Sequence, residues 1–267
     1  MDMFARGLAP ISSEAWKAID DQAVASLRAN LSARRFVDVK GPKGWDAAAI
    51  PTGHLAKWEK AGNIECAVRE SVSLVESRIA FELPYKELFD VERGAGDPDL
   101  DAVEEAARIA AAFEDKVVYE GFAQAGVKGL KDAKGNKPVV LPKADPEAFL
   151  RAIVDAVSKM RVEDSIEGPY ALVGGKSLRE ALGKLVSGRS YFDVVKNSTE
   201  VDEYIFTPSC DCAYLVSKRG GDFELTLGGD FTIGYTDRQG DLLRFFLTES
   251  LTFRILEPRA CTPLALK

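Results

Sequence analysis

A charged stretch from Arg34 to Trp45 limits the possible folds of this chain more than any other feature. It reads Arg-Arg-Phe-Val-Asp-Val-Lys-Gly-Pro-Lys-Gly-Trp, follows a predicted amphipathic helix, and leads into an extended segment without a core of its own. A two-stranded ribbon alone is marginally stable in water, so such a segment has to be covered by something else. We therefore expect a neighbouring copy of the chain to cover it.

The extended segment, residues 45–71, is predicted to form a β-hairpin arm. Its tip is expected at Ala61-Gly62-Asn63, a sequence typical of hairpin turns. On the return strand Ile64, Cys66 and Val68 recur at every second position, which predicts a strand with one exposed face.

Apolar residues at three- and four-residue spacings predict four helices elsewhere in the chain. Ser12 or Ser13 can cap the first helix, and Asp-Pro pairs can begin the second and the third. The predicted helices are residues 13–34, residues 98–121 or 98–126, residues 146–160, and residues 177–186 with Ser177 as the cap.

Strands fill most of the remaining sequence, apart from residues 131–145, which are rich in Lys, Pro and Gly and are predicted to be a linker. Strands are expected at residues 74–83 and 171–173, and again before Pro208. In the last third, alternation of apolar and polar residues predicts antiparallel strands with one buried side. The apolar residues of that side are Leu243, Phe245, Leu247, Leu251, Phe253 and Ile255.

Composition excludes several classes of protein. The 267-residue chain is 46% hydrophobic and 29% charged, which is enough apolar material for a folded core. Its net charge of −7 argues against a nucleic-acid-binding surface. No apolar run approaches the roughly 20 residues of a membrane helix, and the first residues lack the layout of a signal peptide. Four cysteines do not make a disulfide scaffold here, so we expect a protein of the reducing cytoplasm.

The string Val173-Gly-Gly-Lys-Ser177 stands between a predicted strand and a predicted helix, which is the context of a phosphate-binding loop. The full pattern needs a glycine five residues before Gly175, where the chain has Tyr170. Gly168 comes two residues too early, so the cradle of backbone amides would have the wrong length. We interpret this string as a glycine turn; a stand-alone nucleotide-binding enzyme is the least favoured alternative.

The other candidate reactive groups do not form a recognisable site. Cys210-Asp-Cys212 would place two thiols on one strand face, but a structural zinc site takes four ligands, so free thiols are expected. His54 is the only histidine, and no serine lies in a nucleophile-elbow pattern. Glu104-Glu105 and Glu114-Asp115 are interpreted as a solvated or interface face of a helix. We expect no catalysis, no metal and no cofactor.

Five strings of this chain resemble, in the same order, the sequence of the encapsulins. These are bacterial nanocompartment shell proteins built on the tailed-phage major-capsid fold, and the resemblance covers nearly the whole length. The strings are Arg34 to Trp45, Ala112-Phe-Glu-Asp115, Gly126-Val-Lys-Gly-Leu130, residues 229–238 with Gly-Asp-Phe, Ile-Gly-Tyr and Asp-Arg, and Thr248-Glu-Ser-Leu-Thr-Phe253.

The resemblance implies an α+β fold of the phage major-capsid type, with a peripheral domain, an axial domain and an extended loop. It also implies domain boundaries. These are residues 1–43 for the N-terminal helix and the entry to the peripheral domain, 44–72 for the extended loop, 73–130 for the peripheral domain with its spine helix, 131–221 for the axial domain, and 222–267 for the C-terminal sheet of the peripheral domain.

In encapsulins, a short apolar peptide at the C-terminus of a cargo protein docks inside the shell, against the first helix and the nearby sheet. The resemblance assigns this role to seven residues here, namely Leu27, Leu31, Arg34, Asp38, Asp230, Phe231 and Ile233. Apolar pockets would take the peptide side chains, and Arg34 with Asp38 would fix the direction of its backbone. The alternative is that all seven are ordinary core and ion-pair residues.

A second site carried over from the family is the axial-domain loop around the five-fold pore. It matches by position rather than by sequence, and Arg189 would favour anions if it points into the channel. The loop residues are Ser187, Gly188, Arg189, Ser190 and Tyr191.

The resemblance thus implies a shell subunit rather than an enzyme. About 60 copies, or a larger icosahedral multiple, would close into a cage. The partners would be further copies of the chain and a cargo protein bearing a C-terminal targeting peptide, commonly a ferritin-like iron-oxidising protein or a dye-decolourising peroxidase, with no nucleic acid and no membrane. The alternative is a phage or prophage major capsid protein, which the absence of a scaffolding-like N-terminal segment disfavours.

Overall fold

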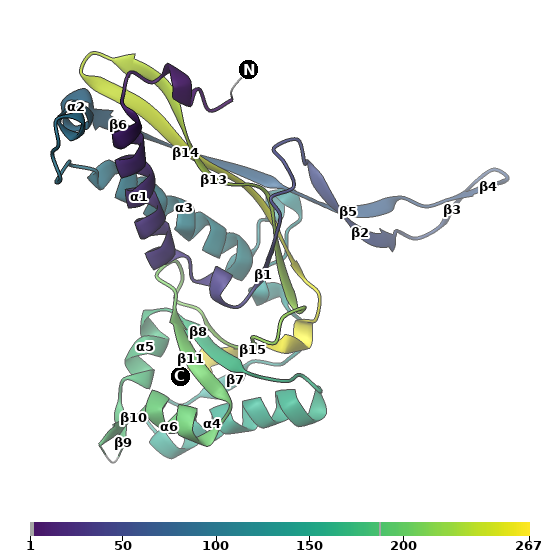
Figure 1. The fold of residues 1–267 in the computed structure, drawn as a ribbon. Coiled ribbons are helices and arrows are strands. Elements are labelled where there is room, and N and C mark those ends of the chain that lie inside the picture. Colours follow the sequence, from purple (N-terminus) through teal and green to yellow (C-terminus); the bar gives the residue numbers. More distant parts are fainter. Residues whose placement is uncertain (1–2, 187) are drawn as a thin grey trace.

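Two sheets and a projecting arm make up the computed structural model, which describes residues 3–186 and 188–267 (Figure 1). The larger unit is built on a four-stranded sheet in the order β1-β13-β14-β6. Its strands are antiparallel neighbours except for β1, which runs parallel to β13. The strands are β1 (Asp38–Lys40), β13 (Phe223–Gln239), β14 (Leu242–Ile255) and β6 (Val75–Pro84).

Helices α1 (Ser13–Asn30) and α3 (Asp101–Glu120) pack against each other and α3 against this sheet, while the short α2 (Tyr85–Glu92) follows β6 (Figure 1). Helices α1 and α3 lie close together because small side chains meet between them. Six alanines are buried between or beneath the two helices, which allows the backbones to approach. They are Ala15, Ala23, Ala106, Ala107, Ala110 and Ala111.

The ends of both helices differ from the sequence prediction. The Ser12 cap is confirmed, since its side chain accepts a hydrogen bond from the Ala15 amide. However, α1 ends at Asn30 rather than near Arg34, because Leu31 is extended and a short 3-10 turn over Ala33–Arg35 follows. The predicted start of α3 at Asp97-Pro98 is wrong, since the helix begins at Asp101.

Both faces of β14 are buried, which corrects the prediction of a single buried side. Thr248 and Thr252 are buried on the face that was expected to be polar and exposed. The segment before the arm covers this part of the sheet: the Trp45 indole occupies the space where a Cβ at Gly229 would stand. The buried polar residues on this face of β14 are therefore covered by the segment around Trp45 and do not face solvent.

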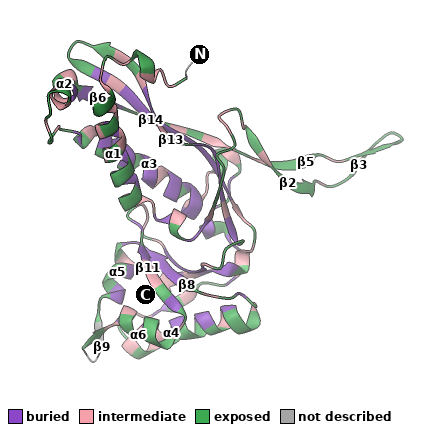
Figure 2. Ribbon diagram, in the orientation of Figure 1, coloured by how far each residue is buried: buried purple, intermediate pink, exposed green. Residues whose placement is uncertain are grey.

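The arm extends from the body as two consecutive two-stranded ribbons (Figure 1). Its tip turn lies where it was predicted, but both faces of the return strand are exposed, not one, because no other part of the described subunit covers it (Figure 2). The strands are β2 (Ala49–Leu55), β3 (Glu59–Ala61), β4 (Ile64–Cys66) and β5 (Arg69–Ser73).

The smaller unit contains a five-stranded sheet in the order β11-β8-β12-β15-β7. Two of its strands correct the sequence interpretation. The predicted linker, residues 131–145, contains β7, and the last segment, residues 222–267, ends in β15 of this sheet instead of remaining wholly in the four-stranded one. The strands are β7 (Val139–Leu141), β8 (Tyr170–Gly174), β11 (Val201–Phe206), β12 (Ala213–Ser217) and β15 (Cys261–Leu266).

Three helices pack beside this sheet, together with a short ribbon of β9 (Leu185–Val186) and β10 (Arg189–Ser190) (Figure 1). The Asp145 cap of α4 is confirmed, whereas α6 was not predicted at all. Gly175, not Ser177, is the N-cap of α5, because the amide and hydroxyl of Ser177 both donate to the Asp211 carboxylate. The helices are α4 (Pro146–Ser158), α5 (Lys176–Leu182) and α6 (Tyr191–Ser198).

One hydrophobic core crosses from the larger unit into the smaller one. The Tyr119 ring of α3 stacks on Phe36, with 6.2 Å between ring centroids, and on Tyr214 of β12, at 6.3 Å. All three side chains are buried. The C-terminal half of α3 therefore fixes how the two sheets sit relative to each other.

Substitution of two glycines in the turn after α3 tests which of them the end of the helix requires. Gly121 has φ 77° and ψ −180°, a region that only glycine occupies readily, and a Cβ there would meet the Val127 and Gly129 backbones. Gly126 also has positive φ, but with open space around it. We expect Gly121→Ala to lower the free energy of unfolding by about 3 kcal/mol and Gly126→Ala by about 1 kcal/mol. Thermal and denaturant unfolding of both variants measures this, and equal losses would contradict it.

Candidate functional site

Arg34 lies at the meeting point of four elements of the larger unit. The 3-10 turn after α1 directs its guanidinium toward α3, β13 and β14. Nε donates to both carboxylate oxygens of Glu114, at 3.0 and 2.9 Å, and Nη2 donates to Glu114 Oε2 at 2.6 Å. Nη2 also lies 2.9 Å from Asp230 Oδ1 and 2.8 Å from Glu249 Oε1. The Arg34 cation thus connects the turn after α1 to α3, β13 and β14.

The burial of these groups is unequal. The side chains of Glu114 and Glu249 are fully buried, whereas the Asp230 side chain is half exposed. Burial alone would lower the pKa of Arg34, but hydrogen bonding and charge from Glu114 raise it, so Arg34 stays protonated. Burial, together with the neighbouring Glu114, raises the pKa of Glu249 well above its usual range.

Asp115 forms a second polar junction one residue further along α3. Its carboxylate accepts from the amides of Ser32 and Ala33, at 3.2 and 2.9 Å, and from the Ser32 hydroxyl. From the smaller unit, the Thr207 and Ser209 hydroxyls also lie within 3.5 Å. Burial raises the pKa of Asp115 to about 6, although the Ser32 and Ala33 hydrogen bonds oppose the shift.

Glu114 and Asp115 therefore do not lie on a solvated helix face, and that prediction is wrong. Both are fully buried, because this face of α3 turns toward the residues that follow α1. Apolar spacing in the sequence cannot separate such a face from a solvated one, since the compensating Arg34 and Ser32 are about 80 residues away.

The structure brings six of the seven candidate docking residues together. Leu27 and Ile233 are buried in one apolar cluster, and Leu31 and Phe231 pack partly buried at its margin. The Arg34 guanidinium lies over the Phe231 ring, 5.0 Å from its centroid, next to Asp230. The result is a small surface of partly exposed apolar and charged groups above a buried apolar floor.

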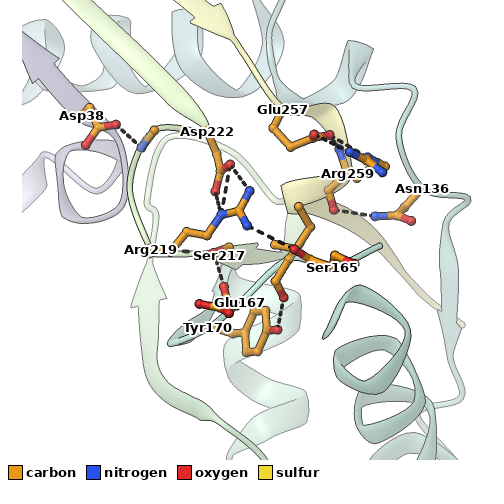
Figure 3. A network of polar contacts seen from close by, with 12 residues as sticks. Asp38, Asn136, Ser165, Glu167, Tyr170, Ser217, Arg219, Asp222, Glu257 and Arg259 are labelled. Carbon is orange, nitrogen blue, oxygen red and sulfur yellow. Dashed lines mark hydrogen bonds and ion pairs between the residues drawn. The ribbon is translucent and has the colours of Figure 1, made fainter. Parts of the chain in front are cut away.

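Asp38 is the exception, because within the described residues its carboxylate bonds the Gly221 amide and makes no ion pair with this cluster. Asp38 begins β1 and accepts a hydrogen bond from the Gly221 amide at 2.5 Å. Figure 3 shows it at the edge of a polar network that includes Arg219 and Asp222 at the junction of the two units. Its carboxylate stabilises the turn before β13, and its role in fixing the direction of a cargo peptide stays a prediction.

The candidate pore loop is mostly a local turn. Gly188 and Arg189 are exposed, and Ser190 caps α6 through a reciprocal hydrogen-bond pair with Asp193. Tyr191 is buried, with its ring 5.2 Å from that of Phe149, so it belongs to the core and not to an opening. Ser187 lies outside the described residues.

The glycine turn before α5 is closely packed. Carbonyl oxygens of Cys210 and Cys212 lie against Gly175 and Gly174, and the Asp211 carboxylate already accepts from the Ser177 amide. A phosphate would need that amide and would meet the carboxylate's charge. Cys210 and Cys212 form a disulfide, so the prediction of free thiols is wrong for this pair. Within residues 3–186 and 188–267, no group of three or more His, Cys, Asp or Glu could hold a metal ion.

An open groove of about 1590 Å³ lies between the base of the arm, the C-terminal half of α3 and the end of β14. Sequence reasoning missed it, because its walls come from segments far apart in the chain. Basic side chains and partly buried aromatic rings share its lining, among them Lys116, Lys128, Lys131, Phe113 and Phe122.

Comparison with known proteins points to a single family. A family profile described as "Encapsulating protein for peroxidase" matches residues 1–252. A type 1 encapsulin shell protein of Rhodospirillum rubrum is 40% identical, with 99% of this chain and 96% of that protein covered. Another, from Mycolicibacterium paratuberculosis, is 36% identical, with 99% of both chains covered.

The chain belongs to the type 1 encapsulin shell proteins. Solved structures agree with the fold of this family. A virus-like particle from Pyrococcus furiosus gives a TM-score of 0.68 at 18% identity, covering 93% of this chain and 98% of that one. The capsid of Myoviridae phage XM1 gives 0.60 at 12% identity, covering 89% and 92%. The predicted family and the phage major-capsid-like α+β fold are therefore confirmed.

Two further findings concern membrane-spanning helices in this encapsulin chain and the role named for its relatives. In the part of the chain that the structure describes, no helix is both long and apolar enough to cross a membrane. The relatives are named as shell proteins, which is a structural role.

Substitution of Arg34 and of its neighbour Arg35 tests how much the buried ion pairs around Arg34 stabilise the fold. Arg34→Ala would leave Glu114 buried without its cation, and removal of one partner of a buried ion pair costs about 3–5 kcal/mol. Arg35→Ala removes a partly exposed pair with Glu203, for which about 1 kcal/mol or less is expected. Thermal unfolding should therefore show a large loss for the first variant and a small one for the second. Equal losses would mean that the buried pair does not hold the junction.

Proposed function

We propose that this chain assembles with copies of itself into a closed icosahedral shell and encloses a cargo protein. About 60 copies, or a larger icosahedral multiple, would form the shell. The single observation that carries this proposal is the arm, whose apolar side chains have no cover within the described subunit. Trp58, Ile64 and Val68 are 59%, 67% and 74% exposed. Exposed apolar residues concentrated on one projecting element mark an interaction surface.

A neighbouring copy is the occupant that fits this surface. The arm carries unpaired strand edges in addition to apolar side chains, and edges of this kind favour pairing or packing with another chain. The groove at the arm base is lined by aromatic rings and by basic and acidic side chains, among the latter Glu70, Glu120 and Asp132, so it offers a partner apolar contact and charges of both signs.

Cargo would dock on the surface formed by Leu31, Arg34, Asp230 and Phe231. A short apolar peptide could place side chains beside Leu31 and Phe231, while Arg34 and Asp230 offer a donor and an acceptor to its backbone. Leu27 and Ile233 would act from beneath as the floor that keeps this surface in place. A targeting peptide at the C-terminus of the cargo fits such a narrow surface.

The shell would have no catalysis of its own, and would act in the cytoplasm by enclosure. The family description points to a peroxidase as cargo, and a ferritin-like iron-oxidising protein is the other class proposed. Small ions would enter near Gly188 and Arg189, whose side of the loop is exposed. A phage or prophage capsid that packages DNA is the alternative, favoured only by the fold likeness to phage capsids.

Assembly can be tested on the arm alone. Ile64→Lys places a charge on the uncovered strand β4, where a subunit contact would have to bury it. We expect soluble, folded subunits and at least a tenfold loss of shells by size-exclusion chromatography and negative-stain imaging, corresponding to about 1.4 kcal/mol or more per contact. Lys60→Ala on the same hairpin is the control and should still assemble. Normal shells from Ile64→Lys would contradict the role of the arm, and an absorbance ratio typical of nucleic acid would favour the phage alternative.

Cargo docking requires a variant that leaves the fold intact. Leu31→Glu puts a charge at the margin of the docking surface, and Ala29→Glu adds the same charge to an exposed position two residues earlier. Shells of both variants isolated from native cells should assemble, but the first should hold at least tenfold less enclosed protein, a loss of about 1.4 kcal/mol in affinity. Quantitative mass spectrometry of the shells measures the cargo. Equal loading would show that the peptide binds elsewhere.

A further inference from the structure

The carboxyl cluster around Arg34 contains more negative charge than one guanidinium can balance. Glu114, Glu249 and Asp230 each place an oxygen within 2.9 Å of Arg34 Nη2. That nitrogen carries two hydrogens and cannot donate fully to three acceptors. Across the described residues, Arg34 is the only cation in an ion pair with Glu114 or with Glu249.

One oxygen of this cluster has no partner. Glu249 Oε1 accepts from Arg34, whereas Glu249 Oε2 is buried and unpaired within the described chain. Glu114 Oε2 and Glu249 Oε1 lie 2.6 and 2.8 Å from the same nitrogen, Arg34 Nη2, so the two carboxyl groups are close neighbours. A buried carboxylate oxygen without a donor is costly, but a carboxylic acid can donate its own proton to a neighbouring carboxylate. A proton on Oε2 would therefore satisfy the unpaired atom and remove one of the excess charges.

The groups that face Glu249 favour its neutral form from most directions. Glu114 approaches from α3 and Asp230 from β13, and both are acidic. From β6, the residue in register with Glu249 is Ser77, whose hydroxyl is buried without a partner as well. Arg34 alone opposes, and it is shared with the other two carboxylates. Burial and Glu114 raise the pKa of Glu249 well above its usual range, in agreement with this arrangement.

We propose that Glu249 is protonated in the folded subunit at neutral pH, donates that proton to Glu114, and in this way positions Arg34. With the proton in place, the guanidinium faces two anions, one buried and one at the surface. Without it, a second buried charge competes for Nη2 and draws it away from Asp230, the solvent-facing member. Glu249 is thus a positioning residue, since it acts on the surface through Arg34. The consequence that alkaline pH weakens cargo docking rests on the proposed function.

Infrared spectroscopy of intact shells detects the proton directly. The C=O stretch of a neutral carboxylic acid is separate from that of a carboxylate, and we expect it in the wild type at about pH 8, where ordinary carboxyls are ionised. Glu249→Gln keeps an acceptor and a donor in the same places and should abolish the band. Asp115→Asn removes a different buried carboxyl, whose pKa of about 6 leaves it mostly ionised at this pH, and should retain the band. No band in the wild type, or a band that survives Glu249→Gln, would overturn the proposal.

The pH dependence of stability is a second readout. Because the folded state holds this proton more tightly than the unfolded chain, stability should fall as pH rises from the ordinary glutamate range to the raised pKa. One such proton changes the unfolding equilibrium about tenfold per pH unit. Glu249→Gln should flatten this slope in thermal unfolding, whereas the control Glu105→Gln, at an exposed pair with Arg108, should leave it unchanged. An unchanged slope in Glu249→Gln would contradict the shared proton.

These two readouts do not involve cargo, so they separate this proposal from the docking function. If the band and the slope behave as expected but loaded shells keep their cargo above the pH at which the band disappears, the proton is real and the docking site lies elsewhere. If the cargo is released at that pH in the wild type and not in Glu249→Gln, both proposals hold together.

Discussion

A guanidinium held among carboxylates in a largely buried setting is the constraint on which the larger unit depends. Arg34 enters from the turn after α1, and its partners come from α3, β13 and β14. A buried ion pair adds little net stability compared with apolar residues of the same size, because removing both charges from water is costly. It does select one geometry, since any other placement of the helix exit would leave Glu114 without a cation. The pair therefore orients the elements that the apolar cluster holds together.

The turn that carries Arg34 also joins the two units. Ser32 and Ala33 donate to Asp115, and the Asp115 carboxylate lies within reach of Thr207 and Ser209 in the smaller unit. Apolar contacts follow the same route through the stacked ring of Tyr119. For a subunit that has to match several neighbours, a fixed angle between its two sheets is a requirement of assembly, because a closed cage repeats every small error in that angle.

The sequence predicted the elements whose signals are local. The spacing of apolar residues predicted the main helices. The arm was predicted as an extended segment that has no core of its own. Sequence prediction failed where a long-range contact decides the outcome. The short strand β7 lies among Lys, Pro and Gly and exists because β15, more than 120 residues later, pairs with it. The capping pair of Ser190 and Asp193 is a local signal, and it could have predicted α6.

The candidate site divides in the same way. Its residues follow from the resemblance to encapsulins, but the buried partners of Arg34 do not, because Glu114 and Glu249 lie 80 and 215 residues away along the chain. Only the fold shows that Asp38 serves the turn at Gly221 (Figure 3). Charge in a sequence identifies which groups need a partner, and the fold decides which partner each one receives.

The arm and the acidic composition have opposite effects on association. Subunits of net charge −7 repel one another, and the repulsion acts over about 8 Å at physiological ionic strength. Burial of apolar side chains such as Trp58 and Ile64 acts only at contact and is insensitive to screening. Shell formation by such a chain should therefore be favoured by added salt, whereas binding of nucleic acid through basic residues is weakened by it.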